Sequence, residues 1–171
     1  MPAAPRNPFA VYRIDPDGRI DRVLAAPQVE APNGVMVAPD DRTLYLVESN
    51  RARGGARRIL AYPVGPDGRL GPSRLFHEFS PGRSGDGMAV DAAGDLWVAA
   101  GLNAPRAGAE TLDTRAGVYV FSPDGVQRRF IPVGEDLVTN VAFAGPDRGA
   151  LFITAGKSLL RIQAQVRGTR R

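Results

Sequence analysis

Three polar residues recur at a constant spacing, each at the beginning of a short apolar strand. Asn33, Asp86 and Thr139 are 53 residues apart in each case, and the chain has no cysteine and one histidine. If the chain folds as a structural repeat, these side chains converge on one place. Amide and carboxylate oxygens are ligands of hard cations such as Ca²⁺ and Mg²⁺. A cation with an open coordination position could polarise a substrate carbonyl.

The same residues have a simpler interpretation. Asn33 and Asp86 both precede glycine, and Asn-Gly and Asp-Gly are common turn sequences. From the residue types alone, the turn interpretation is the more frequent one. The constant spacing favours the ligand interpretation without deciding between the two.

Each of the three residues begins a predicted β-hairpin. In residues 85–99, apolar residues alternate with small or polar ones on both sides of a turn at residues 92–95. Residues 33–47 and 139–154 have the same layout. Alternation with a period of two around a turn is typical of a hairpin.

A second type of hairpin alternates with the first. Its turns are Pro-Asp-Gly sequences at residues 16–18, 66–68 and 123–125, in which proline fixes φ and glycine takes the left-handed position. Two hairpins together make a four-stranded unit of about 50 residues, which is typical of a propeller blade. The sequence therefore predicts an all-β fold of roughly three blades, an incomplete propeller because closed ones have about four to eight.

The predicted blades place one set of residues around one mouth of a central channel. The innermost strand of each blade lines the channel, and the second strand is antiparallel to it, so the loops after the second strand share the face where the first begins. These loops are residues 48–55 and 101–115. We expect the rim of a pocket for a small polar ligand to include Arg51, Arg53, Asn103, Thr139 and Asn140.

The composition argues against two other classes of partner. The net charge is +4, but Lys157 is the only lysine and the arginines are spread along the chain without interleaved aromatic residues. We therefore expect no nucleic-acid partner. No apolar run is long enough to span a bilayer, so no membrane partner is expected. Residues 1–6 lack the apolar segment of a signal peptide, so the cytoplasm is the default compartment unless a signal precedes them.

Three blocks of the sequence resemble the SMP-30/gluconolactonase/LRE family, in the order and spacing of that family. The first block opens on Pro-Asn-Gly at Pro32, and the second contains Gly-Asp-Gly-Met at residues 85–88. The third begins with Thr-Asn at Thr139. The similarity extends from about Tyr12 to Ile162.

This resemblance implies a six-bladed propeller that hydrolyses a sugar lactone with the help of a divalent cation. Asn33 and Asp86 would then be ligands of the cation, for which Ca²⁺ is expected first and Zn²⁺ or Mg²⁺ as alternatives. Asp86 would also be the catalytic general base. A small-molecule lactone is the implied partner. The alternative is a binding or scaffold propeller without catalysis, because a fold does not fix a chemistry.

The chain also departs from the family pattern. The family's first ligand, a glutamate, and a further asparagine belong to blades before the Asn33 block, and neither Glu30 nor Glu48 is a convincing substitute. We expect the chain to be weak or inactive alone. It would be the C-terminal part of a longer propeller or half of a homodimer that closes one ring. The expected divisions are an irregular leader at residues 1–8, the propeller region at 9–165 and a basic tail at 166–171.

Overall fold

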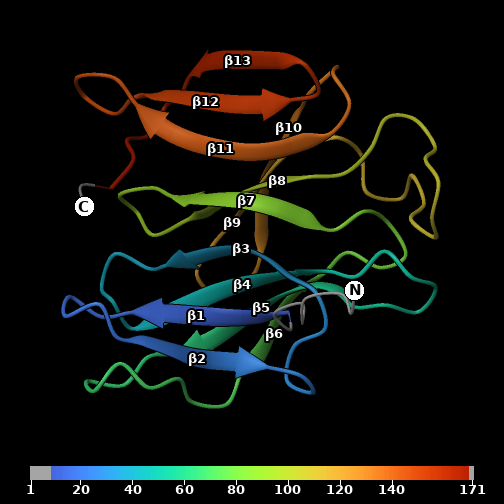
Figure 1. Ribbon diagram of the computed structural model, residues 1–171. Helices are drawn as coiled ribbons and strands as arrows, with labels where there is room; N and C mark the ends of the chain where they lie inside the picture. The colour runs from blue at the N-terminus through green and yellow to red at the C-terminus, as the bar shows by residue number, and fades with distance from the viewer. Residues whose placement is uncertain (1–8, 170–171) are drawn as a thin grey trace, which may run out of the picture.

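The computed structural model describes residues 9–169, which contain thirteen β-strands and no helix. It follows that this range has no helix able to cross a membrane. The strands form four antiparallel sheets, stacked one after another in chain order (Figure 1). The expected leader at residues 1–8 lies outside the described residues.

Two complete four-stranded blades are flanked by two smaller sheets. The first sheet consists of β1 (Ala10–Ile14) and β2 (Ile20–Ala25). The first complete blade consists of β3 (Pro32–Val37), β4 (Thr43–Ser49), β5 (Arg57–Pro63) and β6 (Arg74–Glu78). The second consists of β7 (Gly85–Val90), β8 (Leu96–Ala100), β9 (Gly117–Phe121) and β10 (Gln127–Pro132). The last sheet consists of β11 (Val138–Ala144), β12 (Ala150–Ala155) and β13 (Ser158–Gln163).

Both predicted types of hairpin are present. The Pro-Asp-Gly sequences join β1 to β2, β5 to β6 and β9 to β10, and their glycines have positive φ angles of 84° at Gly18, 73° at Gly68 and 92° at Gly125. Glycine reaches this left-handed conformation without a steric penalty. The turn chemistry in the sequence therefore set the ends of these strands.

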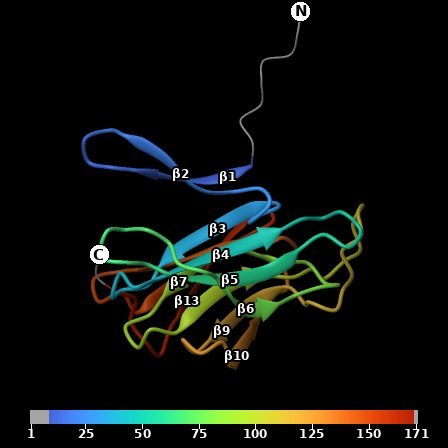
Figure 2. The same ribbon diagram turned by 90° about the horizontal axis from the view of Figure 1, so that it is seen from below.

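The innermost strands lie next to one another, as a propeller requires. β7 contacts both β3 and β11, and the three strands succeed one another in Figure 1. The all-β, incomplete-propeller prediction is confirmed. Seen from below, the hairpin of β1 and β2 forms a layer of its own next to β3 and β4 of the first complete blade (Figure 2).

Three apolar cores hold neighbouring sheets face to face. The first joins Tyr45 and Ile59 of one blade to Val98 and Phe121 of the next. The second lies between the second blade and the last sheet and contains Trp97, Leu151 and Ile153, and the third fixes Leu24 of β2 against Leu46 and Tyr62. Because packed cores resist deformation, the beginnings of the inner strands are held in fixed relative positions.

The segment after β13 returns to the second blade. Gly168 forms an antiparallel bridge with Asp91, and the Ala92 N–H donates to the Arg167 carbonyl at 2.8 Å. Asp91 follows β7, so the described residues of the expected tail, 166–169, lie at the opposite end of β7 from Asp86.

Candidate functional site

A β-bulge occupies the same place at the beginning of all three inner strands. In β3 it lies between Pro32 and Val35, in β7 between Gly85 and Met88, and in β11 between Val138 and Asn140, each with one extra residue relative to the paired strand. Bulges interrupt the ladder and re-aim side chains near functional sites. The repeat predicted from the spacing is therefore a repeat of backbone geometry.

Asn33 and Asp86 line one polar pocket, which we call the mouth pocket. Its volume is about 220 Å³. Its polar and charged lining residues are Asn33, Ser49, Arg51, Arg83, Ser84, Asp86, Arg106 and Glu110. The structure thus brings together the two residues expected to share a site, and Arg51 from the expected rim.

Glycines after Asn33 and Asp86 allow the inner strands to approach closely. A Cβ on Gly34 would lie 1.9 Å from the Asp86 carbonyl oxygen, and one on Gly87 would lie 2.0 Å from the Asn140 side-chain oxygen. Neither glycine has a positive φ, and both lie within strands. The turn interpretation of these two sequences is therefore wrong, since the glycines serve close packing of strands.

Asn33 keeps its carbonyl oxygen open. The residue is exposed, and its Nδ2 donates to Ser49 Oγ at 3.2 Å. Its Oδ1 makes no hydrogen bond within residues 9–169. The amide is thus oriented by Ser49 and presents an acceptor to a ligand.

Asp86 is held by an arginine that the sequence reasoning did not single out. Arg83 Nη2 lies 2.8 Å from Asp86 Oδ2, and its Nη1 donates to the Val138 carbonyl at 3.1 Å. The two side chains are 12% and 21% exposed, so the pair is only partly screened by water. The ion pair fixes one oxygen of Asp86 and ties the start of β7 to β11.

The long loop after β8 contributes two further charged residues. Arg51 Nε lies 3.2 Å from Glu110 Oε2, and the Glu110 side chain is only 4% exposed. Arg51 Nη2 also donates to the Ala107 carbonyl at 3.1 Å. Glu110 and Arg106 were missed by the sequence reasoning, although the loop itself was expected at this face.

Asp136, which lies in the segment between β10 and β11, anchors that loop. Its carboxylate accepts the backbone N–H groups of Asn103, Ala104 and Leu137, each at 3.0 Å. Burial raises the pKa of Asp136, but these hydrogen bonds and the nearby Arg106 charge favour the anion and bring the pKa below its usual value.

The other expected rim residues lie outside the mouth pocket. Arg53 lines a separate hollow with Gly54 and Pro81, and Asn103 Nδ2 donates to the Val133 carbonyl at 2.8 Å. Thr139 Oγ1 lies 2.9 Å from Thr154 Oγ1, and Asn140 Oδ1 accepts the Val141 N–H at 2.9 Å. The structure does not bring these four residues into the pocket, and their contribution to binding stays a prediction.

The two glutamates weighed as substitute ligands are both engaged elsewhere. Glu48 is fully buried, with Oε2 2.9 Å from Arg58 Nη2 and Oε1 accepting the Glu30 N–H. Glu30 accepts from Asn50 Nδ2 at 2.8 Å and from the Ala56 N–H at 3.1 Å. These hydrogen bonds lower the pKa of Glu30, and both carboxylates have structural roles.

The donor set suits a hard cation, although it is small. Within residues 9–169, no group of three or more His, Cys, Asp or Glu residues could hold a metal ion. The mouth pocket nevertheless offers an amide oxygen from Asn33 and the second carboxylate oxygen of Asp86, the donor types that Ca²⁺ and Mg²⁺ prefer. Two donors fit an ion that takes its other ligands from water, substrate or further protein groups.

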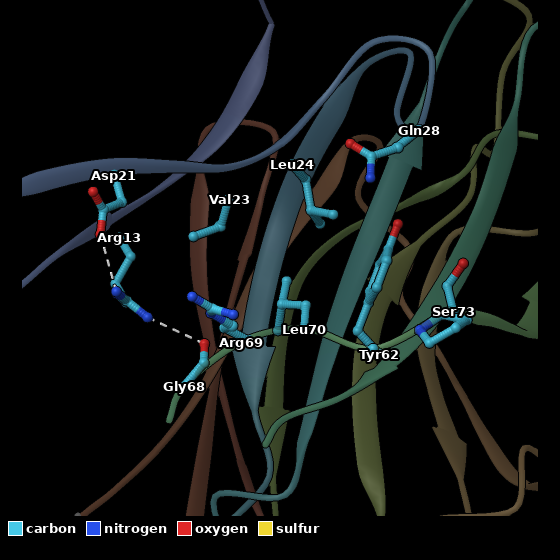
Figure 3. A pocket seen from close by; sticks show the side chains of 12 residues that line it. Arg13, Asp21, Val23, Leu24, Gln28, Tyr62, Gly68, Arg69, Leu70 and Ser73 are labelled. Atoms are coloured by element: carbon cyan, nitrogen blue, oxygen red, sulfur yellow. Dashed lines mark hydrogen bonds and ion pairs between the residues drawn. The ribbon is translucent and has the colours of Figure 1, made fainter. Parts of the chain in front are cut away.

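A larger cavity lies elsewhere and has a different character. It occupies about 640 Å³ between the β1–β2 hairpin and the first complete blade. Apolar residues such as Val23, Leu24 and Leu70 line it (Figure 3). Arg13 there is bonded to Asp21 at 3.0 Å and to the Gly68 carbonyl at 3.2 Å. This hollow is a gap between two sheets, and it contains no residue expected to do chemistry.

Comparisons with known proteins agree with the fold and its family. A profile of the SMP-30/Gluconolactonase/LRE-like region matches residues 2–157. The chain is 30% identical over 171 aligned residues to a gluconolactonase of Zymomonas mobilis, covering 95% of this chain and 42% of that protein. It is 30% identical over 154 residues to a 6-deoxy-6-sulfogluconolactonase of Pseudomonas putida, covering 89% and 46%.

A solved structure gives the same picture. A gluconolactonase of Xanthomonas campestris superposes with a TM-score of 0.73 at 30% identity, covering 98% of this chain and 48% of that one. The chain therefore spans less than half of the length of these three relatives.

Proposed function

Because the chain belongs to the SMP-30/gluconolactonase/LRE-like family, we propose that it takes part in the hydrolysis of a sugar lactone at the mouth pocket. The observation that carries this proposal is the meeting of Asn33 and Asp86, 53 residues apart in sequence, in one polar pocket. The relatives named gluconolactonase and 6-deoxy-6-sulfogluconolactonase support this class of reaction.

We propose that Asn33 and Asp86 hold a divalent cation, with Ca²⁺ first and Zn²⁺ or Mg²⁺ as alternatives. The open oxygens of both residues, described above, support this assignment. Such an ion, when bound, would supply Lewis-acid polarisation of the lactone carbonyl. Ser49 orients the Asn33 amide by its hydrogen bond of 3.2 Å.

Asp86 is the proposed general base. Its carboxylate would accept a proton from the attacking water while the water oxygen bonds to the acyl carbon. The bond from the acyl carbon to the ring oxygen then breaks, and the proton passes to that oxygen to give a hydroxy acid. Arg83, at 2.8 Å, holds the carboxylate in place for this step.

We expect the 171-residue chain to be a weak enzyme by itself. The pocket supplies one carboxylate and one amide as open donors, and the Arg83 charge at 2.8 Å from Asp86 opposes a second cation. Affinity for Ca²⁺ depends on the number and charge of its ligands. We therefore expect weak cation binding and low turnover.

A binding or scaffold propeller is the second candidate. The observation that favours it is the Arg83–Asp86 ion pair, since a carboxylate already neutralised by arginine needs no metal for its charge balance. This candidate predicts that the pocket binds small molecules without turning over a lactone.

The test replaces Asp86 by asparagine, which preserves shape and removes charge. We expect Asp86→Asn to lower lactone hydrolysis by about 10²–10⁴-fold, the usual contribution of a general base, and to weaken Ca²⁺ binding measured by calorimetry. Asp67→Asn is the matched control because it removes the same charge from the turn between β5 and β6, outside the pocket, and it should change neither quantity. Equal activity of Asp86→Asn and the parent chain would refute the proposal.

The expected homodimer stays a prediction, and the strands define what it requires. Two copies would unite the three strands β11–β13 of one with the β1–β2 hairpin of the other, one strand more than a four-stranded blade. One edge strand must therefore be released at each junction. Multi-angle light scattering on the purified chain should give the mass of two copies, and a monodisperse monomer would contradict it.

A further inference from the structure

The mouth pocket contains more positive than negative side chains. Arg51, Arg83 and Arg106 line it together with the carboxylates of Asp86 and Glu110. The three arginines come from different segments: the loop after β4, the segment before β7 and the loop after β8. With a volume of about 220 Å³ and about 30 Å³ for each liquid water, the pocket suits a molecule of small-sugar size.

The three arginines keep N–H groups that are not bonded to any protein acceptor among the described residues. Arg51 bonds through Nε and Nη2, and Arg83 bonds through Nη1 and Nη2. Within residues 9–169, Arg106 makes no hydrogen bond or ion pair, and its charge acts on Asp136 only at longer range. Arg51 and Arg106 are both exposed, so the N–H groups that these bonds leave over are open to water and can be transferred to a ligand.

The positions of the arginines separate two tasks. Arg83 is committed to Asp86 at 2.8 Å and Val138. Arg51 is steered by its contacts with Glu110 and Ala107, and Arg106 belongs to the same loop as Glu110. The inner strands and the segment before β7 therefore supply the groups proposed for the reaction, and the two loops supply cations that the reaction does not use.

We propose that the mouth pocket selects sugar lactones that carry an anionic group, a carboxylate, sulfonate or phosphate, and that Arg106 and Arg51 bind this group. Arginine binds planar and tetrahedral oxyanions through paired N–H donors, more strongly than neutral acceptors. This inference rests on the proposed function. Beyond that function, it specifies that the substrate is negatively charged and that two arginines bind the charged group.

The test begins with binding, which needs no turnover. Gluconate and sorbitol have the same carbon chain and differ in one terminal carboxylate, so calorimetry with the full chain isolates the contribution of charge. We expect gluconate to bind about tenfold more tightly than sorbitol at low salt, and the difference to shrink as NaCl screens the charges. Equal affinities for the two probes would overturn the proposal, whether or not any variant folds.

Single substitutions then identify the arginines that bind the anionic group. Arg106→Gln and Arg51→Gln should each reduce gluconate affinity about five- to tenfold and leave sorbitol unchanged. Arg161→Gln is the matched control, because Arg161 is an exposed arginine of β13 outside the pocket, and it should have no effect. A loss with Arg161→Gln equal to that with Arg106→Gln would show non-specific charge attraction and overturn the assignment.

Hydrolysis separates this inference from the proposed function. The rates for glucono-1,5-lactone and its 6-phospho derivative are compared in the full chain and in Arg106→Gln. Faster hydrolysis of the phosphorylated lactone, lost in the variant, supports both. Hydrolysis without a preference for charge contradicts the inference alone, and gluconate binding without hydrolysis of either lactone contradicts the proposed function alone.

Discussion

The three inner strands have the same backbone conformation at their beginning, but the third differs from the first two in the side chain that it carries there. β3, β7 and β11 all begin with a bulge at the same position. Asn33 and Asp86 use it to reach the mouth pocket, whereas Thr139 bonds to Thr154 at 2.9 Å. The repeat therefore supplies a place for a functional side chain, and the residue type decides whether the place is used.

The residue after each of these positions shows a second difference. At Gly34 and at Gly87, the next inner strand approaches so closely that a Cβ would not fit. The equivalent residue of β11 is Asn140, whose side chain oxygen occupies the space left by Gly87. Among the described residues no inner strand follows β11, so a side chain is tolerated there. Close packing of inner strands, and not turn formation, explains the two glycines.

The largest effect is expected when this close packing is broken at Gly34. A Cβ there would lie 1.9 Å from the backbone oxygen of Asp86, which cannot move without shifting β7. We expect Gly34→Ala to destabilise the fold by about 2 kcal/mol, as overpacking does, and to displace Asp86. Urea denaturation followed by tryptophan fluorescence measures the first effect through Trp97.

The control for this change is a glycine with free space. A Cβ on Gly134 would have no atom within 4 Å, so Gly134→Ala should alter stability by less than about 0.5 kcal/mol. If both alanine variants unfold at the same urea concentration, the close approach of β3 to β7 does not contribute to stability.

The periodic parts of this architecture could be predicted from sequence. Alternating apolar residues and Pro-Asp-Gly turns specify hairpins because their effects are local. The constant spacing of Asn33 and Asp86 then placed them at one mouth, because equivalent positions of a repeat have equivalent surroundings. The family assignment follows from the same periodic blocks.

The loops could not be predicted in the same way. Arg51 reaches the mouth pocket and Arg53, two residues later, does not. Their directions depend on tertiary contacts, such as buried Arg57 donating to the Asn50 and Ala52 carbonyls at 3.1 and 2.8 Å. Glu110 and Arg106 were missed for the same reason, since their loop is held by Asp136 from a distant part of the chain.

An intermediate effect is expected when the partner of Asp86 is removed. Arg83→Met deletes a positive charge 2.8 Å from the carboxylate, so a divalent cation no longer competes with the guanidinium. We expect Ca²⁺ affinity to rise about tenfold, a conservative share of the Coulomb energy at this distance. Isothermal titration calorimetry measures it.

Arg83→Lys is the matched variant because it keeps the charge. It should bind Ca²⁺ about as the parent chain does, while the loss of the bond to Val138 lowers stability in both variants by about 1 kcal/mol. Identical Ca²⁺ affinity in the methionine and lysine variants would show that the ion pair does not oppose cation binding.

The smallest effect is expected when β11 is given a carboxylate at the position where β7 has one. Thr139→Asp places a carboxylate at the position equivalent to Asp86, and its oxygen can still accept the hydroxyl of Thr154, now 2.9 Å from Thr139 Oγ1. Arg83 lies close by, because it already donates to the neighbouring Val138 carbonyl. The new charge should draw the guanidinium from Asp86 and raise Ca²⁺ affinity two- to fivefold, about what a partly exposed charge provides.

Thr139→Asn, which has the same shape without the charge, should leave the affinity unchanged. If the aspartate and asparagine variants bind Ca²⁺ equally, the third strand is not an electrostatic neighbour of the mouth pocket, and the bulges are equivalent in geometry alone.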